Sequence, residues 1–166
     1  MGRYRPPQPK GSPYITAEGY TKLDDELKAK WKRRAYVVKI LAEAAAEGDR
    51  SENAEYIYRK KELREIDYRI RYLQKRLPDL KVVNNLPSNP QQVFFAAWVT
   101  LEDEQGNEKI YRIVGPDEFD AKKGWISMDS PVAKALLKKH IDDEVSVETP
   151  NGIQHYCISN VSYNNL

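Results

Sequence analysis

Two carboxylates, Asp49 and Glu52, stand three residues apart in the segment GDRSENAEY, between two long helical patterns. One interpretation is a capping box, in which the two side chains accept hydrogen bonds from unpaired backbone N–H groups at the start of the second helix. The positive end of the helix dipole also favours carboxylates at that place. The spacing alone favours this interpretation over a role in metal binding.

The alternative interpretation is that both carboxylates point outward and hold a divalent cation. Mg²⁺ prefers oxygen ligands, and it commonly takes one or two protein carboxylates while water or phosphate fills its other positions. Two carboxylates on an exposed turn make a poor site by themselves, because the helix dipole opposes a cation there. Such a pair would bind Mg²⁺ usefully only where another macromolecule supplies the remaining ligands.

The helical pattern before the two carboxylates begins at Thr16, the expected N-cap, and ends at Gly48, the expected helix stop. Its apolar residues recur in steps of three or four, which predicts one apolar stripe along a helix. The residues of this stripe are Tyr20, Leu23, Leu27, Trp31, Ala35, Val38, Leu41 and Ala45.

A second helical pattern runs from Glu52 to Pro78, and only Arg59 interrupts its apolar stripe. Two such helices joined by a short turn are expected to pack antiparallel, as a coiled-coil finger roughly 40–45 Å long with the two carboxylates at its tip. The second stripe consists of Tyr56, Leu63, Ile66, Ile70, Leu73 and Leu77.

Strand patterns replace the helical ones beyond a linker at residues 83–92. The Asn151-Gly152 pair between two of them is a strong hairpin signal. One helix is expected among the strands, with Ser130 as its N-cap and Pro131 at its first position. We therefore predict a small α+β domain over residues 93–166, with about five antiparallel strands and one helix on a face.

Composition divides the chain into two electrostatic halves. Residues 1–90 carry 20 Lys or Arg against 13 Asp or Glu, whereas residues 91–166 carry 7 against 12. The basic half favours a polyanionic partner. The single cysteine, Cys157, excludes an internal disulfide and fits a reducing cytosol. No apolar run suggests a membrane span or a signal peptide, so we expect a cytoplasmic protein.

Several segments together resemble the bacterial transcript cleavage factors GreA and GreB. They are GDRSENAEY, ELREIDYRIRYL, RIVG, and SMDSPVAKALLKK through VETPNG, in colinear order over residues 15 to about 163. Arg50 and the cationic second helix are more similar to GreB than to GreA. The proline-rich arm departs from the usual short start of these factors. The arm, predicted as disordered over residues 1–14 from its proline and cation content, gains no role from the resemblance. The resemblance implies a finger over 15–82 and a C-terminal domain similar to the FKBP-type fold.

The resemblance also implies a function. In this family the finger enters the secondary channel of RNA polymerase, and the tip carboxylates, here Asp49 and Glu52, help position Mg²⁺ and a water molecule. The polymerase then hydrolyses its own backtracked RNA near the 3′ end. In such two-metal catalysis, one ion activates the attacking water and both ions offset the charge of the transition state. The protein itself would not be an enzyme, and we expect a monomer.

Further residues gain roles by the same resemblance. The cations expected to contact the extruded RNA are Arg50, Arg59, Lys60 and Arg64, and the residues expected to bind the rim of the polymerase channel are Asp129, Ser130 and Pro131.

Each of these residues also has a plainer interpretation, and other functions stay open. The cations could form a solvated helix face with pairs inside the helix. The protein could instead be a regulator that occupies the polymerase channel without stimulating cleavage, or it could be a prolyl isomerase. Fold similarity alone is weak evidence for the second.

Overall fold

The computed structural model of the protein describes residues 10–47 and 53–163. These residues fall into two compact units, a helical hairpin within residues 18–80 and a sheet unit that combines residues 10–17 with residues 81–163. The expected antiparallel hairpin and sheet domain are both present. The structure groups the chain just before the first helix with the sheet unit, whereas the sequence analysis divided it between the arm and the finger.

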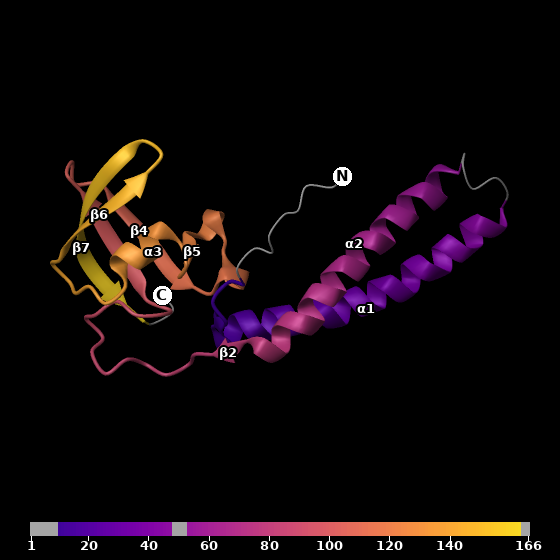
Figure 1. The fold of residues 1–166 in the computed structure, drawn as a ribbon, viewed down its shortest axis with the longest axis horizontal. Coiled ribbons are helices and arrows are strands. Elements are labelled where there is room, and N and C mark those ends of the chain that lie inside the picture. The colour runs from indigo at the N-terminus through magenta and orange to yellow at the C-terminus, as the bar shows by residue number, and fades with distance from the viewer. Residues whose placement is uncertain (1–9, 48–52, 164–166) are drawn as a thin grey trace, which may run out of the picture. The chain divides into compact units, whose positions relative to one another are not determined.

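The helical hairpin consists of α1 (Ala17–Ala46) and α2 (Ala54–Arg76) (Figure 1). At 1.5 Å per residue these helices are roughly 45 and 35 Å long. Ion pairs between the helices, Glu26–Arg69 and Arg33–Glu62, both with N–O distances of 2.7 Å, fix an antiparallel register. A 3-10 turn, Leu77–Asp79, follows α2, in agreement with the helix end predicted at Pro78.

The hairpin is held by a narrow apolar seam. Val37 from α1 is buried against Ile66 and Ile70 from α2, and Leu27 and Leu63 pack against this group. The predicted stripe of α2 is confirmed over Ile66, Ile70, Leu73 and Leu77, which are all buried.

The predicted stripe of α1 is wrong in its middle. Trp31 is 46% exposed, Val38 is 40% exposed, and Ala35 also faces solvent. From Leu23 to Ala35 the predicted stripe takes three successive steps of four residues, and at 100° per residue these turn it by about 120° around the helix. A seam facing one partner must alternate steps of three and four, so Val37 takes the buried position instead.

The sheet unit contains a five-stranded sheet in the order β5-β4-β3-β7-β6. Three of its pairs are antiparallel, as predicted, but β4 and β5 run parallel. The all-antiparallel prediction is therefore wrong at this edge. The connection between β4 and β5 carries two 3-10 turns, Pro116–Glu118 and Ala121–Lys123, rather than a tight hairpin turn. The strands are β3 (Trp98–Asp103), β4 (Glu108–Val114), β5 (Trp125–Ser127), β6 (Glu144–Thr149) and β7 (Gly152–Ser162).

The core of the sheet unit lies between the sheet and one short helix, α3 (Pro131–Leu136). Leu136 from this helix is fully buried together with Val99, Leu101, Ile113 and Ile158 from the strands. The α+β architecture with one helix packed on the sheet agrees with the prediction. This packing fixes the position of the helix start at Ser130 and Pro131.

One cation lies inside this unit. Arg112 is only 6% exposed, and its guanidinium carbon lies 5.4 Å from the ring centre of Trp98 and 5.0 Å from that of Trp125. Both distances suit cation–π attraction, which is strongest where water is excluded. The two tryptophans thus enclose a charged group as well as packing in the domain interior.

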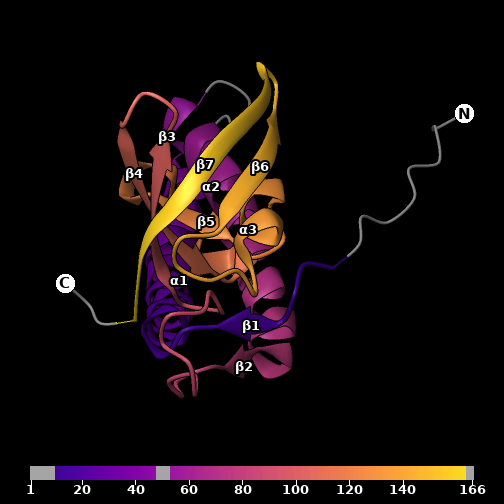
Figure 2. The same ribbon diagram turned by 90° about the vertical axis from the view of Figure 1, so that its left-hand side faces the viewer.

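The chain before α1 joins the sheet unit through a two-residue parallel pair, β1 (Tyr14–Ile15) with β2 (Lys81–Val82) (Figure 2). The backbone of Tyr14 also lies against Gly115, the glycine of the RIVG segment. A residue with a side chain would not fit there, because a Cβ atom would lie 2.0 Å from the carbonyl oxygen of Tyr14. Glu118 adds a polar anchor, since its buried carboxylate accepts hydrogen bonds from the backbone N–H groups of Thr16 and Gly115.

Candidate functional site

The predicted tip, with Gly48, Asp49, Arg50 and Glu52, lies outside the described residues, but the helix ends that present it are described. Asn53 is the N-cap of α2, and its Oδ1 accepts a hydrogen bond from the backbone N–H of Tyr56 at 3.2 Å. Its Nδ2 donates to the carbonyl oxygen of Ala44, in the last turn of α1, at 3.1 Å. One amide therefore binds a backbone donor in the first turn of α2 and a backbone carbonyl in the last turn of α1.

This geometry corrects the capping-box prediction. The N-cap of α2 is Asn53, and the helix begins at Ala54, so Asp49 does not take the N-cap position. Aspartate, serine and asparagine are all good N-caps, and the segment offers one of each, Asp49, Ser51 and Asn53. The sequence signature selected the wrong member of this set. Asp49 and Glu52 themselves lie outside the described residues.

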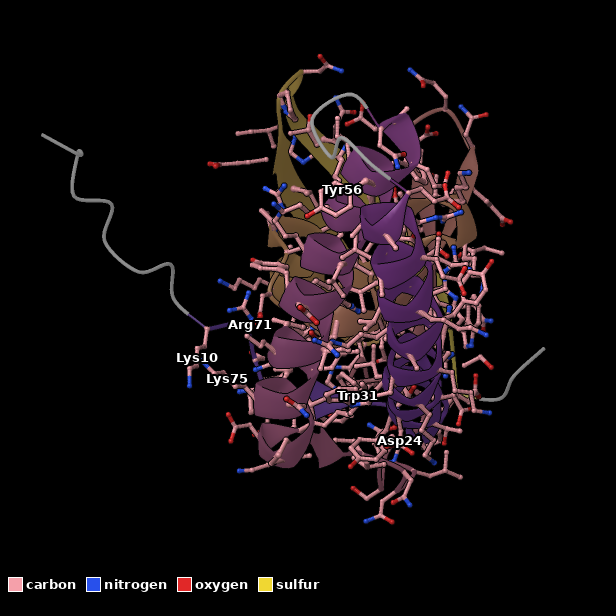
Figure 3. All side chains as sticks on the ribbon, turned by 90° about the vertical axis from the view of Figure 1, so that its right-hand side faces the viewer. Lys10, Asp24, Trp31, Tyr56, Arg71 and Lys75 are labelled. Atoms are coloured by element: carbon pink, nitrogen blue, oxygen red, sulfur yellow. The ribbon has the colours of Figure 1, made fainter. Side chains whose placement is uncertain are left out.

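Tyr56 lies in the first turn of α2, close to the segment that links the helices (Figure 3). Its side chain is half-buried, in agreement with its predicted seam position, and the ammonium group of Lys60 lies 5.8 Å from its ring centre. Tyr56 is thus part of the hairpin seam and also supports a cation one turn further along α2.

The predicted RNA-contact residue Arg59 is tied into a network of carboxylates. It donates to Glu55 at 2.8 Å and to Glu62 at 2.7 Å, and Glu62 also accepts from Arg33. These hydrogen bonds raise the pKa of Arg59, and those from Arg33 and Arg59 lower the pKa of the Glu62 carboxyl. The Arg59 side chain is 19% exposed, so most of its surface is covered within the hairpin.

The other two described cations of this prediction have different surroundings. Lys60 and Arg64 are both exposed, and within the described residues neither takes part in an ion pair. Their charges therefore face solvent instead of being countered by a neighbouring carboxylate. Contact with RNA by any of these residues stays a prediction.

Arg64 also lines a groove of about 680 Å³ on one face of the hairpin. Two aromatic side chains share this groove, Trp31 at 46% exposure and Tyr68 at 72%, together with the exposed Arg71. Figure 3 shows Trp31 between the two helices and Arg71 along the edge of α2. Cations interleaved with exposed aromatic rings suit a single-stranded nucleic acid, because the rings can stack on bases while the cations bind phosphates.

The sequence analysis missed this groove because it placed Trp31 in the seam and gave no role to Tyr68. The signal that could have found it is the run of four-residue steps in α1, which turns Trp31 out of the buried seam. An exposed tryptophan beside exposed arginines such as Arg64 and Arg71 is a stronger indication of binding than a count of cations.

The three residues predicted to bind the polymerase come together at the start of α3. The hydroxyl of Ser130 accepts a hydrogen bond from the backbone N–H of Ala133 at 3.2 Å, which confirms its predicted role as N-cap. Pro131 is exposed at the first helical position. Asp129 is half-buried, and its carboxylate accepts hydrogen bonds from Ser12.

Three further observations concern metal binding, the single cysteine and membrane spans. Residues 10–47 and 53–163 contain no group of three or more His, Cys, Asp or Glu side chains arranged to hold a metal ion. Cys157 is half-buried, and burial together with nearby carboxylates raises the pKa of its thiol. Among the described helices, none combines the length and the apolar character needed to cross a membrane.

Comparison with known proteins identifies the class of protein that this arrangement belongs to. The family model "Transcription elongation factor, N-terminal" matches residues 13–82, and "Transcription elongation factor, GreA/GreB, C-term" matches residues 87–163. The chain therefore belongs to the GreA/GreB family of transcription elongation factors.

Two similar proteins bear the name GreB, and one similar solved structure is of a GreA factor homolog. "Transcription elongation factor GreB" of Pseudomonas aeruginosa is 55% identical over 164 residues, which cover 98% of each chain. The protein of the same name from Yersinia pestis is 57% identical over 153 residues, 92% of this chain and 90% of that one. The crystal structure of GreA factor homolog 1 of Thermus thermophilus is 26% identical, covers 89% of this chain and 97% of that one, and has a TM-score of 0.42.

Proposed function

We propose that this protein binds bacterial RNA polymerase, inserts its helical hairpin into the secondary channel, and stimulates Mg²⁺-dependent cleavage of backtracked RNA by the polymerase. The observation that carries the proposal is the pair Asp49 and Glu52 between two long helices, in a chain of the GreA/GreB family. A regulator that only occupied the channel would not need acidic residues at this place.

The capping of α2 supports this role for the two carboxylates. Asn53 occupies the N-cap position of α2, so the N-cap bond to Tyr56 needs neither Asp49 nor Glu52. Carboxylate oxygens are the donor type that Mg²⁺ takes from proteins. A pair of carboxylates does not complete such a site, so the aspartates of the polymerase and a phosphate of the RNA would supply the rest.

The chemistry supplied by bound Mg²⁺ would be activation of water and neutralisation of charge in an in-line displacement at phosphorus. The residues of this chain have the task of bringing negative charge to the polymerase active centre. The hairpin suits this task because it carries the two carboxylates at the end of helices that its own seam and ion pairs hold together. The protein would therefore not be a nuclease by itself.

The cations of α2 supply a second part of the proposal. We assign contact with the phosphates of the extruded RNA to Lys60 and Arg64, with Arg50 nearer the tip, because the described pair is exposed and takes part in no described ion pair. Arg59 contributes a weaker contact, since Glu55 and Glu62 already counter its charge. The groove around Trp31 would accept bases of the same strand.

The sheet unit would bind the polymerase through the start of α3, at Asp129, Ser130 and Pro131. Pro131 is exposed there, and the packing of α3 against the sheet holds the three residues on a rigid element. Anchoring by one unit and catalytic support by the other explains why a single chain carries a basic half and an acidic half.

The decisive experiment measures RNA shortening in a stalled, backtracked elongation complex, with and without Mg²⁺. Asp49→Asn and Glu52→Gln remove the negative charges and retain similar shapes. We expect each to reduce cleavage by at least about 10-fold, since even the outer-shell partners of a metal contribute that much. The melting temperature and the polymerase affinity should stay unchanged, and raised Mg²⁺ should restore part of the activity.

Glu47→Gln is the matched control, because it removes one exposed negative charge next to the end of α1 without touching the pair. It should cleave like the parent protein. Full activity in the double variant of Asp49 and Glu52 would overturn the proposal and favour a channel-binding regulator.

A further inference from the structure

The segment before β1 makes a long-range contact with the start of α3. The backbone N–H of Ser12 donates to Oδ2 of Asp129 at 2.8 Å, and the hydroxyl of Ser12 donates to Oδ1 at 2.5 Å. A single serine thus binds both oxygens of one carboxylate, 117 positions away in the sequence. Hydrogen bonds to an ionised acceptor are among the stronger ones in proteins.

Ser12 is held in place on both sides. On one side, Gly11 packs so closely on Pro116 that an added Cβ atom would lie 2.9 Å from its Cγ. On the other side, the carbonyl oxygen of Pro13 accepts a hydrogen bond from the backbone N–H of Lys81 at 2.6 Å, where β1 begins to pair with β2. The contact between Ser12 and Asp129 is therefore part of a continuous attachment within the sheet unit.

This contact restricts the Asp129 side chain. Two donors in fixed positions define both the χ1 rotamer and the plane of the carboxylate, and the backbone N–H of Asp129 donates to the Ser127 hydroxyl at 3.1 Å. Asp129 remains half-buried, so part of it faces solvent next to the exposed Pro131. A side chain that is already ordered loses less conformational entropy when a partner binds it.

We propose that Ser12 is a positioning residue for Asp129, so that the polymerase-binding surface is a composite of residues 11–13 and the start of α3. This inference rests on the proposed function, which assigns Asp129 to that surface. An ionised carboxylate only accepts hydrogen bonds, so the complementary group on the polymerase is a donor, best a lysine or arginine side chain. The N-terminal segment would fix the direction from which that donor approaches.

Ser12→Ala tests the inference, because it deletes the hydroxyl and retains the backbone N–H. We expect the affinity of the full chain for RNA polymerase to fall roughly 2- to 10-fold, which corresponds to the usual entropy of one immobilised polar side chain. Ser12→Thr keeps a hydroxyl and should restore most of the affinity. Ser146→Ala is the matched control, since it removes an exposed serine hydroxyl, bonded to His155, from another part of the same unit.

A double-mutant cycle separates positioning from general stabilisation. If Ser12 acts through Asp129, Ser12→Ala should have no further effect on affinity in an Asp129→Ala background. All affinities are measured well below the melting temperature of each variant, so loss of folded protein cannot imitate the effect. Equal additive losses in both backgrounds would overturn the inference.

Two other outcomes distinguish this inference from the proposed function. If Asp129→Ala weakens binding and Ser12→Ala does not, Ser12 has no positioning role, while the proposed polymerase contact stands. If neither substitution changes the affinity, the inference is again wrong, and Asp129 is also removed from the proposed surface. RNA cleavage that persists in that case would still support the role of the tip carboxylates.

Discussion

Replacing Asn53 with alanine removes two hydrogen bonds from the end of the helical hairpin where the chain passes from α1 to α2. The first is the N-cap bond to Tyr56, and loss of an N-cap typically costs about 0.5–2 kcal/mol. The second is the bond to the Ala44 carbonyl oxygen, with a net contribution of about 0.5–1.5 kcal/mol. Asn53→Ala should therefore destabilise the hairpin by about 1–3.5 kcal/mol.

Asn53→Ser separates the two contributions. Serine caps a helix about as well as asparagine but has no amide to reach Ala44, so this variant should lose only the second bond, about 0.5–1.5 kcal/mol. A loss of 1 kcal/mol lowers the melting temperature of a domain of this size by about 4–8 °C. The expected order of melting temperatures is parent, then Asn53→Ser, then Asn53→Ala.

The assay is thermal unfolding of the full chain followed by circular dichroism at a helix band, where α1 and α2 dominate. Asn85→Ala, an exposed asparagine in the linker, controls for the change of residue type. If Asn53→Ala melted like the parent, neither bond would stabilise the hairpin. If the serine and alanine variants melted together below the parent, the cap itself would contribute nothing and the bond to Ala44 would carry the whole effect.

Two further predictions concern the charges of the hairpin. Lys60→Gln and Arg64→Gln should each reduce the slope of log affinity against log salt concentration, for binding to backtracked complexes, by about 0.7, the value for one phosphate on a single strand. Arg59→Gln should change this slope less, because carboxylates already bind Arg59. Equal slopes for all variants would contradict the prediction. Hydrogen bonds from arginines lower the pKa of the Glu26 and Glu62 carboxyls in the folded state. These carboxylates therefore stabilise the fold fully above the usual carboxyl pKa of about 4.3, and the stabilisation is lost as the pH falls through their lower folded pKa values. Acid unfolding of Glu26→Gln should therefore show a smaller loss of stability in that range than the parent, and identical acid transitions would rule out the contribution of Glu26.

The parts of the fold that repeat along the chain were predictable from the sequence. In α2 the apolar residues alternate in steps of three and four, and Ile66, Ile70 and Leu73 are all buried. The start of α3 was equally clear, because Ser130 and Pro131 give two independent signals for the same residue. In both cases a local pattern is sufficient to determine the structure.

Other features depend on contacts that no local pattern encodes. The strands β1 and β2 have two residues each, too few to show an alternation, and the Tyr14 backbone lies so close to Gly115 that a Cβ atom there would collide with it. The parallel direction of β5 depends on the path of the chain after β4. The bond between Ser12 and Asp129 joins segments that are 117 positions apart, so only the folded unit reveals it.

The number of cations in α2 exaggerates its capacity to bind phosphate, and the structure shows why. Residues 59–76 contain eight Lys or Arg, but Arg59 and Arg69 are held by carboxylates. The Arg69–Glu26 pair links the two helices, and Arg59 pairs within α2 with Glu62, which also binds Arg33 of α1. These cations stabilise the hairpin, so using them for RNA would weaken the element that carries the tip. Lys60 and Arg64 are exposed, and neither forms an ion pair with another described residue. Phosphate binding should therefore concentrate on the exposed cations, where a contact with RNA leaves the ion pairs between the helices intact.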